Sequence, residues 1–264
     1  MDNSIFMIHG MWNGGWCWKE FRNFFEGKGY SCFTPTLRFH DVDPKEPPHP
    51  ELGTTSLLDY AADLENEIRK LDHPPIIIGH SMGGLLAQIL GSRGLARALV
   101  LLAPAPPRGI IALKPSSFRG VWSCITRRCF WRKPCRQTYN EAVYSTMNLL
   151  PAEKQKETYE KMVSESGRAV FEIGLWFLDS NRASEVDASK VTCPALVIGG
   201  TQDRLVPAST VRKIARRYKG LATYHEYADH AHKILTEPGW QDIAEDIAGW
   251  FKTVLNGEYK ENQQ

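Results

Sequence analysis

The 264-residue sequence has no uninterrupted apolar run of the ~18 residues that a membrane span requires. Its first residues also lack the basic segment and the long apolar run of a secretory signal peptide. Neither sign of charge is in large excess, because 32 basic and 30 acidic residues leave a net charge of only +2 at pH 7. We therefore expect a cytoplasmic protein without stable membrane insertion and without a nucleic-acid partner.

Cysteine is too sparse and too scattered for a disulfide scaffold, since the chain has only six cysteines. Three of them, Cys124, Cys129 and Cys135, lie close together among arginines. Their spacing matches no standard zinc pattern, so we expect free thiols and no metal site.

Short apolar runs alternate with amphipathic stretches along most of the chain. This alternation predicts an α/β fold, in which a mostly parallel central sheet carries helices on both faces. The expected strands are 5–8, 31–35, 76–78, 98–103, 195–198 and 223–227, and the expected helices are 16–27, 56–71, 85–90, 208–218 and 241–255.

The alternation stops between residues 108 and 188, where no buried strand is evident. Helical patches at 140–148, 153–164 and 168–178 and many aromatic residues predict a mainly helical insertion. The expected domains are thus a core of residues 1–107 and 189–257, the insertion at 108–188, and a polar tail at 258–264.

The motif Gly79-His80-Ser81-Met82-Gly83 fits the pattern G-x-S-x-G. It follows a buried strand and precedes a helix, which is the context of a nucleophile elbow, where a serine is held on a sharp turn. Ser81 is therefore the candidate nucleophile; the alternative is an ordinary glycine turn that contains a serine.

A serine nucleophile needs a base, and the base needs an orienting acid that precedes it in the chain of such folds. Asp203 follows the expected strand 195–198, at the carboxyl edge of the sheet where ligand sites gather. We assign it as the acid, with a loop or helix-capping aspartate as the alternative.

Two histidines, His230 and His232, follow the last expected strand. We prefer His232 as the base because its interval to Glu237 and Pro238, near the final helix, is the usual one; His230 is the alternative. His225 is expected within the strand, and Asp229 is too close in the chain to orient His232.

Acyl transfer also requires donors for the developing oxyanion. The backbone N–H of Met82, directly after the nucleophile, is one candidate. The second is the N–H of Met11, in the loop after the first strand, where Gly10 allows a tight turn; a plain strand-to-helix loop is the alternative. No cofactor is expected.

In these motifs the chain resembles the α/β-hydrolase fold superfamily. The resemblance rests on the segments 8–11, 79–84 and 200–203 and on His232 before Glu237-Pro238, in that order. The segment Gly14-Gly15-Trp16-Cys17-Trp18 is similar to the plant methylesterase and hydroxynitrile lyase branch. Members with aspartate as nucleophile are epoxide hydrolases and dehalogenases, reactions that Ser81 excludes.

The resemblance implies that the insertion is a cap over Ser81 whose aromatic residues help to line a substrate pocket. Trp12, Trp122 and Trp176 are the pocket candidates, although many aromatics of the insertion will form its own small core. The basic residues Arg127, Arg128, Arg132, Lys133 and Arg136 could meet an anionic or phospholipid-like substrate, or form a solvated basic face.

The expected function is a serine esterase that cleaves a small or medium, partly apolar carboxylic ester through an acyl-enzyme. The same residues could also serve a carbon–carbon bond hydrolase, an acyltransferase, a thioesterase or amidase, a cofactor-free lyase, or a slow-turnover ligand receptor. The expected partner is a small-molecule ester, and the sequence gives no oligomeric state.

Overall fold

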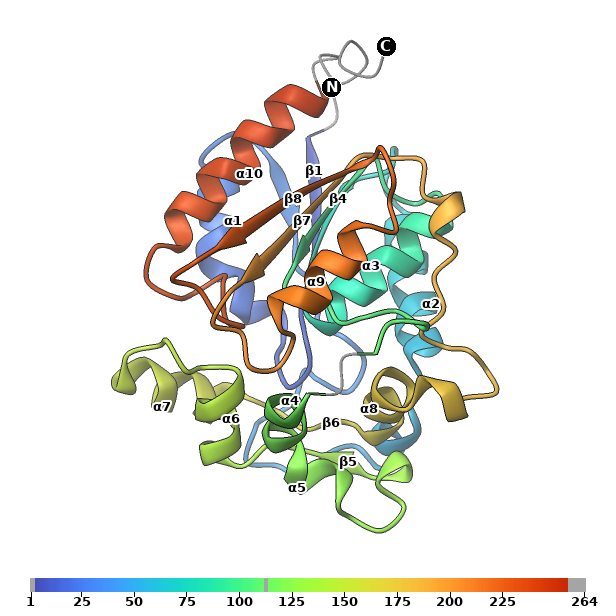
Figure 1. Cartoon of the computed structure of the whole chain (residues 1–264), viewed down its shortest axis with the longest axis vertical. Coiled ribbons are helices and arrows are strands. Elements are labelled where there is room, and N and C mark those ends of the chain that lie inside the picture. Colours follow the sequence, from blue (N-terminus) through green and yellow to red (C-terminus); the bar gives the residue numbers. More distant parts are fainter. Residues whose placement is uncertain (1–2, 112–113, 256–264) are drawn as a thin grey trace.

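The central sheet has six strands and is parallel throughout (Figure 1). The computed structural model describes residues 3–111 and 114–255, so the polar tail expected at 258–264 lies outside the described residues. The strand order is β2-β1-β3-β4-β7-β8. The bounds are β1 Ser4–Ile8, β2 Ser31–Phe33, β3 Ile76–His80, β4 Ala98–Leu102, β7 Ala195–Gly200 and β8 Ala222–Tyr227.

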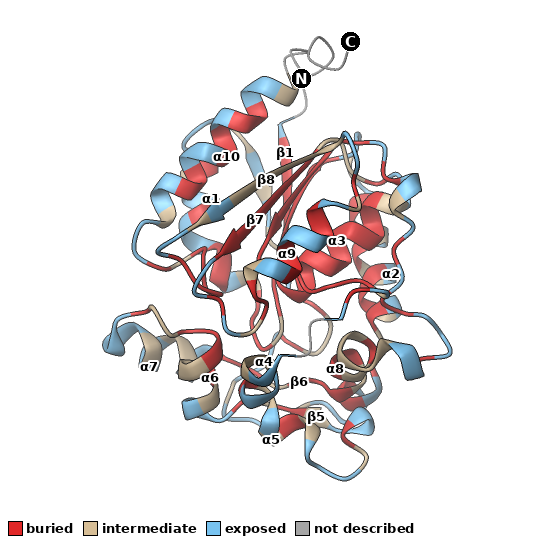
Figure 2. Cartoon of the chain, viewed as in Figure 1, coloured by how far each residue is buried: buried red, intermediate tan, exposed pale blue. Residues whose placement is uncertain are grey.

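Helices cover both faces of the sheet, which confirms the expected fold class (Figure 1). One face packs against α1 and α10, and the other against α2, α3 and α9. Strands β1, β3, β4 and β7 are buried along their whole length, as their continuous apolar runs predict (Figure 2). The helices are α1 Lys19–Glu26, α2 Leu57–Ile68, α3 Met82–Ser92, α9 Ala208–Ala215 and α10 Trp240–Leu255, with 3-10 turns η1 Gly15–Trp18, η2 Pro50–Thr54 and η5 Ala188–Lys190.

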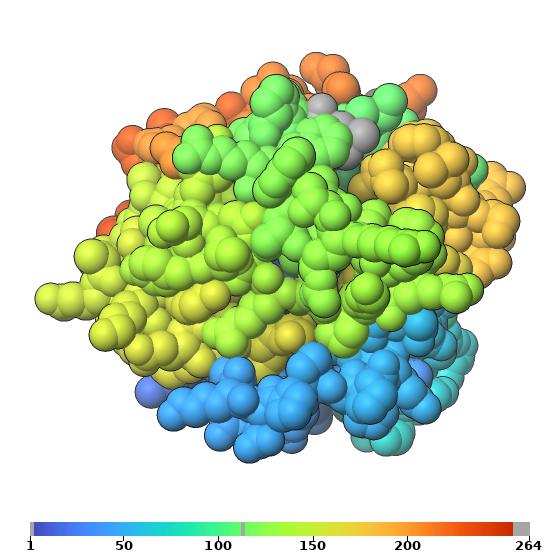
Figure 3. Space-filling view, turned by 90° about the horizontal axis from the view of Figure 1, so that it is seen from below, coloured from blue at the N-terminus to red at the C-terminus, as the bar shows by residue number. Residues whose placement is uncertain are grey.

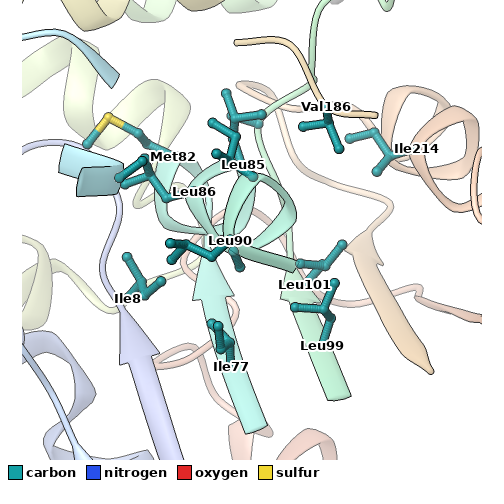
Figure 4. Packing of buried hydrophobic residues seen from close by; sticks show 14 of the residues in the cluster. Ile8, Ile77, Met82, Leu85, Leu86, Leu90, Leu99, Leu101, Val186 and Ile214 are labelled. Carbon is teal, nitrogen blue, oxygen red and sulfur yellow. The ribbon is translucent and has the colours of Figure 1, made fainter. Parts of the chain in front are cut away.

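Helix α3 is the most deeply buried of these helices, and it carries Ser81 at its N-terminus. Its leucines Leu85, Leu86 and Leu90 pack over the sheet beside Ile77 and Leu99 (Figure 4). Burial of each such side chain stabilises the fold by roughly 1.5–3 kcal/mol. The helix is therefore a rigid support for the residue at its start.

The segment between β4 and β7 lies at the end of the molecule that the carboxyl ends of the strands face (Figure 1). It has its own apolar cluster, which includes Cys124, Phe130, Met147 and Val170. Its elements are α4 Pro115–Gly120, α5 Trp122–Ile125, η3 Phe130–Arg132, β5 Pro134–Cys135, α6 Tyr139–Ser145, α7 Ala152–Lys161, β6 Glu165–Ser166, α8 Gly167–Gly174 and η4 Trp176–Leu178.

Several boundaries differ from the expected ones. Helix α3 begins at Met82 rather than at 85, because the turn at Ser81 leads straight into the helix. The expected helix 16–27 starts as a 3-10 turn, and the helix expected to continue to residue 178 ends at Gly174. The antiparallel pair of β5 and β6 was not expected, because two-residue strands leave no periodicity to detect.

A buried ion pair joins the insertion to the core. Glu165 on β6 accepts hydrogen bonds from His40 Nε2 at 3.1 Å and from the Tyr60 hydroxyl at 2.8 Å. Both ring nitrogens of His40 face acceptors, since Nδ1 also lies 2.9 Å from the carbonyl of Arg38. Burial opposes the charge on both partners, but their mutual attraction raises the pKa of His40 and lowers that of Glu165. The pair therefore favours the imidazolium form of His40.

Candidate active site

Ser81 occupies a strained turn between β3 and α3. Its φ of 54° and ψ of −118° place a non-glycine residue in a region that L-residues rarely adopt. Close packing requires the glycines around it, because a Cβ on Gly83 would lie 2.1 Å from the Ile8 carbonyl oxygen and one on Gly79 2.3 Å from the Gly83 carbonyl oxygen. This strained strand–turn–helix geometry is what a nucleophile elbow requires.

The structure brings Ser81, His232 and Asp203 into one hydrogen-bonded chain. His232 Nε2 lies 3.0 Å from Ser81 Oγ, and His232 Nδ1 lies 2.8 Å from Asp203 Oδ2. All three residues are buried, with at most 7% of any of them exposed. An imidazole in this position can accept the serine proton while the carboxylate stabilises the imidazolium.

Asp203 is fixed by its own loop. Its second oxygen, Oδ1, accepts hydrogen bonds from the backbone amides of Leu205 and Val206, both at 2.8 Å. The side chain therefore shapes the turn before α9 with one oxygen and faces His232 with the other. Asp203 thus has the loop contacts of one interpretation and the contact with His232 that the other requires.

The loop that carries His232 is held by Glu237. The two carboxylate oxygens accept the amides of Ala231 at 2.7 Å and Lys233 at 2.9 Å, on either side of the histidine. Glu237 precedes α10, which begins at Trp240. Gly200 lets the loop approach the sheet, because a Cβ there would lie 2.3 Å from the His230 carbonyl oxygen.

His230 lies apart from this chain of hydrogen bonds. Its Nδ1 is 3.4 Å from Glu237 Oε2, and its ring packs edge-on against Tyr227. Asp229 is exposed, and His225 lies within β8 as expected. The geometry thus supports His232 rather than His230 as the partner of Ser81.

Two further histidines beside Ser81 are buried and neutral. Burial lowers the pKa of His9 to about 3, and it lowers the pKa of His80 well below its usual value. His80 Nε2 donates to the His232 carbonyl oxygen at 2.8 Å. His9 Nε2 accepts the Leu37 amide at 3.0 Å, so its Nδ1 donates to the Gly10 carbonyl oxygen. They hold the loops on both sides of Ser81 without adding charge.

The two candidate oxyanion donors lie beside Ser81. Gly10 approaches Ser81 so closely that a Cβ on it would lie 2.9 Å from Ser81 Cβ, which brings the following amide of Met11 to the site. Met82 is the first residue of α3, and amides in the first turn of a helix have no intrahelical acceptor. Met11, Met82 and Ser81 all border one cavity.

A lysine missed by the sequence analysis also borders the site. Lys233 is buried, and its Nζ donates to Asn13 Oδ1 at 2.7 Å. Asn13 Nδ2 in turn donates to the Met11 carbonyl oxygen at 2.6 Å. Burial lowers the pKa of Lys233. Neither Lys233 nor Asn13 has a sequence signal of its own, because their importance comes from contacts between distant loops. Glu237 served in the sequence only as a marker for His232, and its contacts with the His232 loop were not expected.

The main cavity, of about 290 Å³, lies between the core and the insertion and opens onto Ser81. Among the described residues, its walls are mostly apolar, with the Ser81 and Ser117 hydroxyls and two indole rings among them, and no lining side chain is charged. It is lined by Met11, Trp12, Ser81, Met82, Ala105, Pro106, Ser117, Phe118, Val121, Ile125, Phe130, Val170, Ile173, Gly174, Leu175, Trp176, Leu205 and Val206.

The three tryptophans predicted for the pocket have different places. Trp12 lines the cavity and donates from Nε1 to the Cys135 carbonyl oxygen at 3.2 Å. Trp176 also lines it, and the Arg108 guanidinium lies 5.2 Å from its ring centroid. Trp122 is not a lining residue; its side chain lies on the outer side of α5 and is 60% exposed.

All six cysteines are free thiols. Within residues 3–111 and 114–255, no group of three or more His, Cys, Asp or Glu side chains is arranged to hold a metal ion. Across the same residues, no helix is both long and apolar enough to cross a bilayer.

Comparison with known proteins agrees with the architecture. The sequence profile described as the alpha/beta hydrolase family matches residues 5–245. No curated protein matches the chain with statistical significance.

Three similar solved structures show the shared fold. A pyrethroid hydrolase from Sphingobium faniae is 17% identical over 94% of this chain and 96% of its own, with a TM-score of 0.70. A monoacylglycerol lipase from Paleococcus ferrophilus is 18% identical over 94% and 93%, with a TM-score of 0.67. A methylesterase from Arabidopsis is 13% identical over 94% and 98%, with a TM-score of 0.69. The family expected from the motifs is thus confirmed, and this chain belongs to the alpha/beta hydrolase family.

Proposed function

We propose that the protein is a serine esterase that cleaves a carboxylic ester with a largely apolar acyl or alcohol part. The observation that carries this proposal is the hydrogen-bonded chain from Ser81 Oγ through His232 to Asp203 at the carboxyl edge of the sheet. The pyrethroid hydrolase, lipase and methylesterase that share the fold are compatible with ester cleavage.

In the proposed mechanism, Ser81 attacks the ester carbonyl as His232 takes its proton. Asp203 keeps the imidazole in the reactive tautomer and stabilises the imidazolium. The amides of Met11 and Met82 stabilise the oxyanion of the tetrahedral intermediate. His232 then protonates the leaving alcohol and activates the water that cleaves the acyl-enzyme.

The cavity would select a substrate whose acyl or alcohol part is apolar. Its uncharged walls disfavour a charged group, since a buried charge without a partner is costly. We propose that the insertion acts as the cap of this cavity, and that Trp12 and Trp176 contact the bound substrate.

The experiment is hydrolysis of p-nitrophenyl esters of increasing acyl length by the wild type, Ser81→Ala and His230→Ala. Wild type should release p-nitrophenol, and Ser81→Ala should lower kcat by at least about 10³-fold because the nucleophile is lost. His230→Ala is the matched control and should retain most of the activity.

A burst of product without turnover would replace the esterase proposal with an acyltransferase or a slow receptor. Release that persists in folded Ser81→Ala would contradict the assignment of the nucleophile. No release by a folded wild type from any ester would overturn simple esterase activity.

A further inference from the structure

The first part of the insertion carries charge of one sign only. Residues 108–139 contain eight basic residues and no acidic one. Because the whole chain has a net charge of +2, the remaining residues together carry −6. The basic residues are Arg108, Lys114, Arg119, Arg127, Arg128, Arg132, Lys133 and Arg136.

Six of these cations are exposed and lack an acidic partner. They are Lys114, Arg119, Arg127, Arg128, Arg132 and Lys133, and no ion pair with another described residue involves any of them. Elsewhere on the surface, exposed cations such as Arg22, Arg69 and Lys161 pair with glutamates. Other exposed cations, such as Lys213 and Lys219, also form no ion pair with a described residue, so the distinguishing feature of this segment is the lack of any acidic residue among its eight cations. Such a run of positive charge suits contact with an external anion.

Large apolar side chains are exposed between these cations. Ile111 is 63% exposed, Trp122 60%, Trp131 38% and Phe118 37%. We call residue 111 and residues 114–133 the basic–aromatic segment. It lies at the end of the molecule away from the sheet, and Figure 3 looks onto that end, where the green chain of this region lies across the face.

The same helices form a wall of the substrate cavity. Phe118, Val121 and Ile125 line it, whereas Arg119 and Trp122 lie between them in sequence and are exposed. The helical spacing of α4 and α5 thus directs one set of residues to the cavity and the other outward. A ligand on the outer side of α4 and α5 would therefore be separated from the proposed substrate only by these helices.

We propose that the basic–aromatic segment docks the protein on an anionic lipid surface. Lysine and arginine are attracted to anionic headgroups, and exposed tryptophan and phenylalanine insert at the boundary with the acyl chains. An RNA would match the cations but not the exposed aliphatic side chain of Ile111. Docking in this orientation brings the apolar cavity to the membrane, where apolar esters dissolve.

The test is sedimentation with phosphatidylcholine vesicles that contain or lack phosphatidylserine, at low and high salt. Wild type should bind only the anionic vesicles, and salt should weaken the binding. The variant Arg127→Gln/Arg128→Gln/Lys133→Gln should bind at least about tenfold more weakly. Trp122→Ser should also bind more weakly, although it keeps every charge.

The matched control is Lys213→Gln/Arg216→Gln/Lys219→Gln, which removes three exposed cations near α9. It should bind vesicles as wild type does, and both triple variants should hydrolyse a soluble ester at the wild-type rate.

Absence of vesicle binding by wild type at low salt would overturn the proposal. Equal losses in both triple variants would also overturn it, as would tighter binding to single-stranded RNA that Trp122→Ser leaves unchanged. Vesicle binding does not depend on turnover, so its failure is distinct from failure of the proposed esterase activity.

Discussion

Around Ser81, burial changes the pKa values of histidines and a lysine for which the sequence alone indicates no shift. His9 and Lys233 lie in loops at the site and His80 ends β3, and burial lowers the pKa of each. The neutral imidazoles of His9 and His80 keep positive charge away from His232, which accepts a proton in the proposed mechanism. These pKa shifts depend on desolvation by segments that are distant in sequence, so the sequence alone does not predict them.

Acid should therefore destabilise the protein through His9. Its pKa is about 3 in the folded chain but near the usual 6.5 when unfolded, so below pH 6.5 the unfolded chain binds the additional proton. The stability that neutral His9 contributes is present above pH 6.5. As the pH falls toward 3, the free energy of unfolding decreases by ~1.4 kcal/mol per pH unit. Urea unfolding of wild type and His9→Gln between pH 7 and 4 measures the slope of the unfolding free energy against pH.

His9→Gln should have a shallower slope over that range than wild type. The exposed His73 supplies the control, since His73→Gln should leave the slope unchanged. Parallel slopes for wild type and His9→Gln would contradict a buried neutral His9.

At the scale of elements, the contact between β1, β3 and α3 is the tightest feature near the site. Gly83 touches the backbone of β1, and Gly84 touches Pro104 after β4. The helix can cross the strand ends only because these positions have no side chain. The elbow is therefore a property of three elements and their glycines together.

Gly83→Ala should destabilise the fold by at least about 3 kcal/mol, at the upper end of overpacking effects. The new Cβ would lie 2.1 Å and 2.5 Å from the carbonyl oxygens of Ile8 and His9, and backbone atoms cannot move aside easily. Gly249→Ala in α10 is the control, since its Cβ would meet nothing within 4 Å.

Thermal and urea unfolding will compare the two variants. Gly249→Ala should be neutral or raise stability by about 0.5–1 kcal/mol, because alanine favours a helix interior. Equal stability of Gly83→Ala and wild type would show that the helix does not pack this closely.

The sequence predicted the elements whose signal is local. Apolar runs located the six strands, and the position of Ser81, Asp203 and His232 just after β3, β7 and β8 predicted that they would meet. The pair β5–β6 and the contacts of Glu237 and Asn13 could not be predicted, because each depends on tertiary packing. Trp122 was placed in the pocket because aromatic content does not reveal which side of a short helix faces inward.

At the scale of the molecule, the insertion and the core meet through an apolar cavity and a buried ion pair. The cavity leaves apolar side chains without contacts in the absence of a ligand, whereas Glu165 and His40 form a polar connection. The Glu165 contacts therefore help to hold the insertion on the core, together with other polar contacts such as those of Glu172 with Ser56 and Leu57.

Glu165→Gln should cost about 3–5 kcal/mol, because it leaves the His40 imidazolium buried without its counter-charge. The double variant His40→Gln/Glu165→Gln should cost less than the sum of the two single variants. A double-mutant cycle of unfolding free energies measures this coupling, and limited proteolysis will show whether cleavage begins in residues 108–188. Simple additivity of the two substitutions would show that the pair is not coupled.

The connection from β4 to β7 also determines the order in which the sheet can assemble. These strands are neighbours, yet residues 103–194 separate them along the chain. Closing so long a loop costs about 4 kcal/mol of chain entropy before any pairing is gained. During synthesis, β1 to β4 emerge first, and the apolar edge of β4 stays open until β7 follows. The nascent chain therefore exposes an aggregation-prone strand for the whole time in which the insertion is made.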